Sequence, residues 1–160
     1  MNKNMANELH NINNYPEIQK SIYLIEAIWI IERKSGICIF DKSYKEQEKS
    51  GITGDLICGF FSAFVDISEE FFNQQVEFIK LHDSRLYFTF LKNVIFVIKF
   101  EEGLLLEEEI EDIIFGISLE FITEFPDVLS NWNGNLHKFE TFSKILNEIV
   151  GIHPAYVYFN

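Results

Sequence analysis

Several features that mark particular protein classes are scarce or missing in this 160-residue sequence. It has two cysteines, Cys38 and Cys58, and no CxxC pair, so we expect buried free thiols in a reducing compartment, although the sequence leaves a disulfide between them open. No apolar run approaches the roughly 20 residues that a membrane-spanning helix needs. The amino-terminal residues are polar and rich in Asn, without the apolar core of a signal peptide. We therefore expect a cytoplasmic protein.

Positive charge is also scarce. There are 13 Lys and Arg residues against 25 Asp and Glu residues, which gives a formal net charge of -12. The basic residues are scattered along the chain and form no stripe. Nucleic acids and anionic membranes both need local positive potential, so we expect neither as a partner. A partner with a basic surface is compatible with this charge.

Motifs for metal, phosphate or acyl-transfer chemistry are missing as well. The four histidines do not pair with other ligand types at metal-binding spacing; they are His10, His82, His137 and His153. The Gly51–Gly54 step before a predicted helix lacks the GK[ST] ending of a phosphate-binding loop, and there is no GxSxG elbow. We expect no enzyme, no metal and no cofactor. An enzyme with dispersed site residues stays a minor hypothesis, resting on Glu26, Lys80 and Lys99 within apolar segments.

The sequence contains periodic apolar segments in a number that fits a single domain. We expect a flexible leader over residues 1–20, a single domain over residues 21–151 and an aromatic tail over residues 152–160. The patterns predict strands over residues 22–32, 37–41, 76–81, 86–91 and 94–100, and helices over residues 55–71, 105–125 and 137–150. Gly36 is available for a positive φ in the first turn, and Asp55 opens the first helix as its N-cap or as a first-turn carboxylate.

The first and last of these strands are almost wholly apolar. A half-solvated strand alternates apolar and polar residues, so continuous apolarity indicates that both faces are covered. These two strands therefore belong in the middle of the sheet, with helices on both sides. The shorter strands over residues 37–41 and 76–81 suit the edges. The prediction is an α+β fold with a five-stranded antiparallel sheet in the order 2-1-5-4-3.

That order of elements, together with the apolar spacing, resembles the longin family, whose shape is related to profilin-like and roadblock domains. The resembling segments are IWIIERKSGICIFDKSY, DLICGFFSAFVDISEEF, KLHDSRLYFTFLKNVIFVIKFEEG, EFITEFPDVLSNWNGN and HKFETFSKILNEIV. The resemblance implies one helix on one face of the sheet and two on the other. Roadblock domains begin with a helix before the hairpin, and no good helix is predicted there, which favours longin over roadblock.

Longin-like domains are binding modules, so the resemblance implies protein–protein contact. It implies vesicle trafficking as the setting, with a small Ras-like GTPase, or another longin or roadblock subunit, as the partner, and a homodimer as a further option. No SNARE-type heptads follow the domain, so we expect a stand-alone adaptor or regulator. A structural subunit of a longin or roadblock complex that binds no GTPase is an alternative.

The helix predicted over residues 55–71 is the most informative segment for function. Its apolar arc is wider than one sheet face requires, and its polar remainder includes Ser62. We expect a partner groove between this helix and the edge strand over residues 76–81, where Val76 and Phe78 point to the same side. The expected partner-binding residues are Phe60, Phe61, Phe64, Val65, Val76 and Phe78. Alternatively, a loop, the leader or the tail covers the surplus apolar surface of this helix. If the tail does so, Tyr156–Phe159 would mask the groove until a partner displaces this segment.

A ligand-sensing domain is the second functional class. PAS-like folds share the 2-1-5-4-3 sheet and enclose a small molecule. Helices on both faces of the sheet leave less room for such a cavity, which disfavours this alternative.

Overall fold

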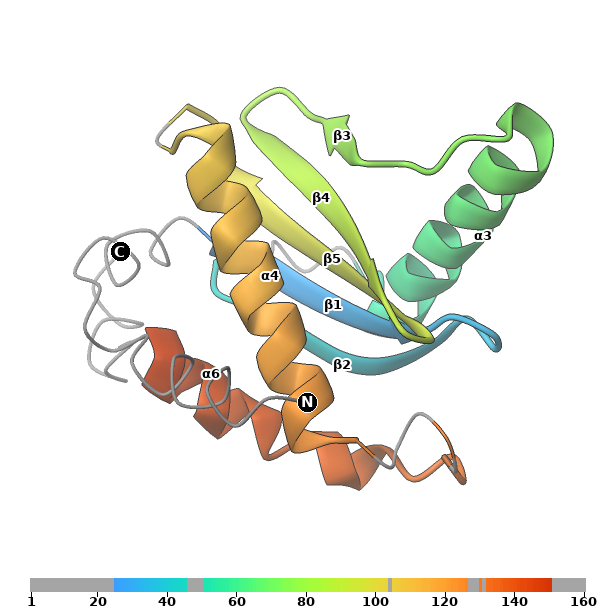
Figure 1. Ribbon diagram of the computed structural model, residues 1–160, viewed down its shortest axis with the longest axis vertical. Coiled ribbons are helices and arrows are strands. Elements are labelled where there is room, and N and C mark those ends of the chain that lie inside the picture. The colour runs from blue at the N-terminus through green and yellow to red at the C-terminus, as the bar shows by residue number, and fades with distance from the viewer. Residues whose placement is uncertain (1–24, 46–50, 104, 127–129, 131, 151–160) are drawn as a thin grey trace, which may run out of the picture.

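The computed structural model describes residues 25–45, 51–103, 105–126, 130 and 132–150 (Figure 1). In chain order the elements are β1 (Ile25–Glu32), β2 (Ile37–Ser43), α3 (Gly54–Phe72), β3 (Phe78–Lys80), β4 (Ser84–Leu91), β5 (Val94–Glu101), α4 (Glu107–Glu124), the 3-10 helix η2 (Leu136–Phe139) and α6 (Phe142–Val150). All of them fall within the single domain expected over residues 21–151. The expected leader and tail lie outside the described residues.

The five strands form one antiparallel sheet in the order β2-β1-β5-β4-β3. This is the predicted order, and it places the two continuously apolar strands, β1 and β5, next to each other. Every residue of β1 is buried. Trp29 at its centre faces Asp41 of β2 on one side and Val97 of β5 on the other. The first strand of the early hairpin is mostly apolar on both faces because it lies inside the sheet.

Side chains leave β1 and β5 alternately on the two faces, and each face has its own helices. One face carries the cluster around Trp29 and Val97, which α3 covers with Cys58, Phe61 and Val65. The opposite face carries a larger cluster that α4 and α6 cover (Figure 1). The predicted layering, with one helix on one face and two on the other, is confirmed.

The larger cluster is organised around one aromatic side chain of α4. Phe121 is fully buried, and its ring lies 5.7 Å from that of Phe96 on β5, 5.6 Å from Phe139 of η2 and 5.0 Å from Phe142 of α6. The sequence predicts one continuous helix over residues 137–150, but the structure separates η2 from α6. Phe139, at the end of η2, and Phe142, at the start of α6, both contact Phe121.

The edge strands differ from prediction in length. The strand predicted over residues 76–81 is reduced to Phe78–Lys80, and the one predicted over 37–41 extends to Ser43. The register of β2 shifts opposite Ile30 and Ile31, so that Ile39 is the extra residue of a bulge. Helix α3 begins after Thr53, whose hydroxyl accepts a hydrogen bond from the amide of Leu56 at 3.4 Å. Asp55 is therefore the first-turn carboxylate and not the N-cap.

The two hairpin turns at one end of the sheet are joined by a single buried carboxylate. Glu32 accepts hydrogen bonds from the amides of Lys34 and Ser35 (3.2 and 2.8 Å), from the Ser35 hydroxyl (2.5 Å) and from the Asn93 side chain. Desolvation works against the charged form, but these donors outweigh it and lower the pKa of Glu32. The charged carboxylate thus holds the β1–β2 turn against the β4–β5 turn.

Replacing Glu32 with Gln should destabilise the fold by about 1–3 kcal/mol near neutral pH, because an amide presents a donor where donors already converge. Glu32 has a lowered folded pKa, so its contribution is present above the unfolded pKa and is lost as pH falls through the folded pKa. The free energies of unfolding of the unsubstituted protein and of Glu32→Gln, measured in urea between about pH 7 and about pH 3, should therefore differ less as the pH falls. Glu124→Gln, an exposed change at the end of α4, is the control; equal effects of the two variants would contradict this role.

Candidate protein-interaction site

Helix α3 is anchored to the sheet by only part of its length. Its buried residues are Cys58, Phe61, Ser62 and Val65, and none of the helical residues after Val65 is buried. Figure 1 shows the carboxyl-terminal half of the helix diverging from the sheet. Arg33, next to the first hairpin turn, forms an ion pair with Glu69 and tethers this half. The helix therefore projects from the domain with most of its outer surface uncovered.

Ser62 explains how α3 approaches the first hairpin so closely. The sequence assigns Ser62 to the polar face of the helix, but it is buried against the β1–β2 turn. Gly36 in that turn has a φ of 70°, as predicted, and a Cβ built on it would lie 3.0 Å from the Ser62 hydroxyl oxygen. A small residue is needed on both sides of this contact. The helix is consequently rotated so that Ser62 faces inward.

With Ser62 inward, a continuous apolar stripe faces outward. Leu56, Phe60, Ile67 and Phe71 are 64, 61, 57 and 80% exposed, and Ala63 between them is also exposed. Their spacing of four, seven and four residues puts them on one side of the helix over four turns. Large hydrophobic side chains are rarely left exposed in a row on a monomeric protein, and such patches mark interaction surfaces. We call these five residues the α3 stripe.

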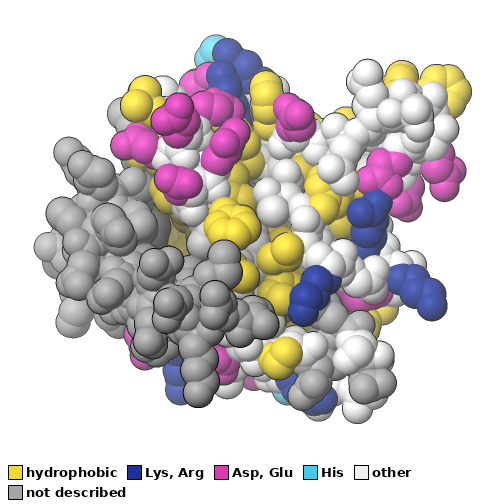
Figure 2. Space-filling view, viewed as in Figure 1, with side chains coloured by type: hydrophobic (Ala, Val, Ile, Leu, Met, Phe, Trp, Pro, Cys, Tyr) yellow, Lys and Arg dark blue, Asp and Glu magenta, His cyan; other side chains and the backbone are white. Residues whose placement is uncertain are grey.

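The surroundings of the α3 stripe are acidic. Helix α3 contains Asp55, Asp66, Glu69 and Glu70 and no Lys or Arg. In the upper right of Figure 2, hydrophobic side chains lie at the tip of the projecting end of α3, and acidic side chains lie lower on it, next to a Lys or Arg side chain. Phe71 and Phe72 meet there edge to face, with ring centroids 5.1 Å apart, just before Asn73 ends the helix in a left-handed conformation. A complementary surface would be apolar with a basic rim.

The six residues predicted to bind a partner do not share one surface. Phe61 and Val65 lie in the core under α3, where they are 4% and 0% exposed. Phe60 is exposed, and Phe64 is half-buried and stacks on it with ring centroids 6.3 Å apart. The residues of the α3 stripe that sequence reasoning left out of the site, Leu56, Ile67 and Phe71, carry the same spacing signal as Phe60; what the sequence could not show was which side of the helix faces the sheet.

Val76 and Phe78 lie on opposite faces of the sheet, contrary to the predicted alternation. Val76 precedes β3 and packs against the α3-covered cluster. Phe78 contacts Tyr87 on the face covered by α4, with ring centroids 5.9 Å apart. The chain between α3 and β3 is not regular strand, so the period-two rule does not extend across it. Phe78 is therefore not adjacent to the α3 stripe.

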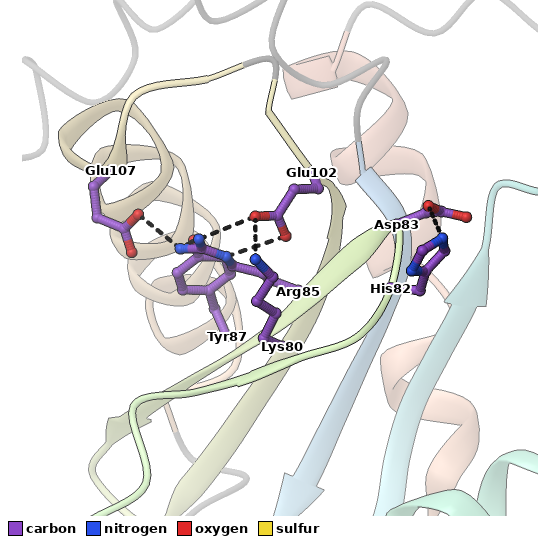
Figure 3. A network of polar contacts seen from close by, with 7 residues as sticks. All are labelled: Lys80, His82, Asp83, Arg85, Tyr87, Glu102 and Glu107. Atoms are coloured by element: carbon purple, nitrogen blue, oxygen red, sulfur yellow. Dashed lines mark hydrogen bonds and ion pairs between the residues drawn. The ribbon is translucent and has the colours of Figure 1, made fainter.

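A polar network holds β3 and its neighbours in place beside this face (Figure 3). The Arg85 guanidinium donates to both carboxylate oxygens of Glu102, at 3.2 and 3.0 Å, and to Glu107 at the start of α4, at 3.3 Å. Lys80 of β3 pairs with the same Glu102 at 3.5 Å. The Arg85 guanidinium also lies 5.2 Å from the centre of the Phe78 ring. Hydrogen bonding from Arg85 lowers the pKa of Glu102, so this carboxylate stays charged.

The titratable residues that the sequence left as catalytic candidates are all held in ion pairs. Glu26 pairs with Lys99 at 2.5 Å and with Lys45 at 2.6 Å, and Lys80 pairs with Glu102. Desolvation opposes the charged form of Glu26, but its two lysines lower its pKa. Within the described residues, no group of three or more His, Cys, Asp or Glu side chains is placed to hold a metal ion. No helix in the same part of the chain has the length and apolar character needed to cross a membrane.

Comparison with known proteins gives likenesses to solved structures only. No family model and no curated protein sequence matches this chain. Among solved structures, Myxococcus xanthus MglB is similar at 15% sequence identity and a TM-score of 0.46, over 72% of this chain and 91% of that chain. The fold described above stands on the strand order and packing of this chain's own residues.

The same substitution at two adjacent phenylalanines on α3 should change the free energy of unfolding by very different amounts. Phe60→Ser should change the free energy of unfolding by less than about 0.5 kcal/mol, because the side chain is exposed. Phe61→Ser should destabilise by roughly 3–5 kcal/mol, because it empties a core position. Urea unfolding measures both. Equal destabilisation would mean that the outer side of α3 is buried in solution.

Replacing Arg85 with Met should release β3 without unfolding the domain. The aliphatic side chain keeps the packing on Phe78 but loses the ion pairs with Glu102 and Glu107. Amide hydrogen exchange should accelerate at Phe78–Lys80 and stay unchanged in β1 and β5. Lys92→Met, in the exposed β4–β5 turn, is the matched control. Unchanged exchange in β3 would show that its backbone pairing with β4 suffices to hold it.

Proposed function

We propose that this chain is a longin-like protein-interaction module without catalytic activity, and that it binds its partner through the α3 stripe. The observation that carries the proposal is the row of exposed apolar side chains along the outer side of α3. The sheet order and the distribution of helices agree with what the longin resemblance implies. Function does not follow from fold alone, so the proposal rests on the exposed α3 stripe and not on the topology of the sheet.

The α3 stripe offers enough surface for a specific contact. Burying one large apolar side chain contributes about 1.5–3 kcal/mol. Four such residues spread over four turns therefore contribute a free energy of the same order as the cost of lost translational and rotational freedom, and the polar rim adds to it. A partner ridge of apolar side chains, packed along the helix and rimmed by Lys or Arg, would match both the shape and the charge of this surface.

For the partner we propose a small Ras-like GTPase, with the chain acting as an adaptor or regulator in a cytoplasmic, membrane-traffic-type system. The longin resemblance supports this class of partner, and the acidic surround of the stripe favours a basic surface on it. Another longin or roadblock subunit is the second candidate, since it too would cover an apolar helix. A homodimer through two α3 stripes would bring Asp66 and Glu70 of both copies to one interface, and this repulsion disfavours it.

The PAS-like alternative fits the packing less well. Both faces of the central strands are filled by side chains, with Ile28, Ile95, Phe96 and Val97 all 0% exposed. A small-molecule sensor needs space beside its sheet, and close-packed side chains occupy that space here. The structure therefore favours a surface-acting module over a ligand-enclosing one.

The decisive experiment measures binding of the full chain to the Ras-like GTPases of its host in the GDP, GTP-analogue and nucleotide-free forms. The Phe60→Asp and Ile67→Asp variants should each weaken binding at least tenfold, since a charge placed in an apolar interface is desolvated without a partner. Phe115→Asp, an exposed phenylalanine on α4, should bind normally and serves as the matched control.

The nucleotide dependence assigns the role. Preference for the nucleotide-free form would indicate an exchange factor, and preference for the GTP form an effector or adaptor. If no form binds and the variants fold normally, the GTPase proposal is wrong. Capture of a longin or roadblock subunit that Phe60→Asp abolishes would then assign the chain to a structural role in such a complex.

A further inference from the structure

A second surface lies at the opposite edge of the sheet from β3. Strand β2 pairs with β1 on one side, and no described strand pairs with its outer edge. A groove of about 460 Å³ follows this edge and is lined by five consecutive strand residues, Cys38–Lys42. Its walls are the first turn of α3, with Asp55, and the η2–α6 segment, with Leu136 and Glu140. We call this the β2 groove.

The β2 groove has an apolar floor and an acidic rim. Phe40 and Phe139 are buried beneath it, and Leu136 is 44% exposed beside it. Asp41, Asp55 and Glu140 are exposed around it. Glu140 contacts His137 at 2.7 Å, whereas Asp41 and Asp55 form no ion pair with any described residue. Within the described part of the chain, the two aspartates thus lie close to each other as like charges without a paired cation.

Lys42, the basic residue among the described residues that line the β2 groove, is directed away from these aspartates. Lys42 alternates with Asp41 along the strand, and its Nζ donates to Ser143 Oγ at 2.7 Å and to Asn147 Oδ1 at 2.8 Å, both on α6. Asp41 lies instead against the start of α3, where a Cβ built on Gly54 would come within 2.9 Å of its carboxylate. Partial burial, followed by repulsion from Asp55, raises the pKa of Asp41. A cationic side chain bound beside Asp41 would offset both the desolvation and the repulsion from Asp55.

The bulge in β2 limits how an incoming segment can bind. Ile39 is the extra residue, and both Ile39 and Phe40 point into the α4-covered core. Beyond the bulge, residues 40–43 pair regularly with β1, at Phe40 with Ile30 through Ser43 with Ala27. A regular edge presents unpaired backbone donors and acceptors that an extended chain can use. The available edge is therefore four residues long.

We propose that the β2 groove binds a short extended segment of a partner protein, which pairs with Phe40–Ser43 and places a Lys or Arg side chain against Asp41 and Asp55. Charge complementarity selects this occupant. Asp41 and Asp55 have no ion-pair partner among the described residues, and the apolar floor accepts a neighbouring side chain of the segment. This site is separate from the α3 stripe and does not depend on the proposed GTPase partner.

The probe is an N-acetylated, C-amidated heptapeptide that alternates Val and Lys, titrated into the full chain and followed by amide chemical shifts. A Val–Glu peptide tests charge, and a Pro–Lys peptide, which cannot form a ladder, tests strand pairing. The Val–Lys peptide should shift the amides of residues 38–43 and bind more weakly as salt is raised, and the other two peptides should not bind.

The variants separate a specific site from general acidity. Asp41→Asn and Asp55→Asn should each weaken binding of the Val–Lys peptide about two- to fivefold, in the range of an exposed ion pair. Asp41→Asn should also raise the urea midpoint of the free protein, because it removes the repulsion. Asp112→Asn, the same change on the exposed surface of α4, should alter neither property.

Three results would overturn the proposal. The first is equal binding of the Val–Lys and Val–Glu peptides, and the second is equal weakening by Asp41→Asn and Asp112→Asn. The third is strong protection of the outward-facing amides of residues 40–43 from hydrogen exchange in the free full chain, which would show that the chain itself covers this edge. Because Phe60→Asp leaves the β2 groove intact, loss of GTPase binding in that variant and loss of peptide binding in Asp41→Asn test the two proposals separately.

Discussion

The structure depends on one constraint, which is that β1 and β5 carry apolar side chains on both faces. Water must be excluded from both sides of a strand pair of this kind, and a single layer of helices cannot do so. The chain meets the constraint by placing α3 on one face and α4 with α6 on the other. The position of the first hairpin follows from it too, because the later meander of β4 and β5 must add beside β1 and leave β2 at the edge.

The two faces of the sheet carry apolar clusters of different size, and this difference leaves part of α3 exposed. The face under α4 and α6 is filled by large aromatic rings around Phe121, and it needs two helices. The other face is covered by the first three turns of α3, whose inward residues end at Val65. The remaining turns are tethered by the Arg33–Glu69 ion pair and have no sheet beneath them. Their large apolar residues, Ile67, Phe71 and Phe72, therefore stay exposed.

The strand order was predictable because continuous apolarity in a strand has a single structural meaning, burial on both faces. The orientation of α3 was not, because this helix is apolar over most of its circumference and periodicity alone could not choose the inner side. Ser62 is inside since Gly36 approaches it closely, a contact between distant residues that local pattern cannot reveal. For the same reason Phe61 and Val65 belong to the core while Phe60 belongs to the surface. The prediction that Phe78 shares a side with Val76 was wrong because strand alternation was assumed through residues 76 and 77, which precede β3.

The α3 stripe and the β2 groove meet at the start of one helix. Asp55 forms part of the groove wall, and Leu56, the next residue, begins the stripe. Helix α3, which carries the stripe and forms one wall of the groove, contains no Lys or Arg, so both surfaces share its negative charge. Helix α3 is fixed to β2 through Gly54 at Asp41, so the distance between the two surfaces is set by the fold and not by a linker. A basic partner with an extended segment next to an apolar ridge would engage both, and the second contact would form at the high effective concentration that the first creates.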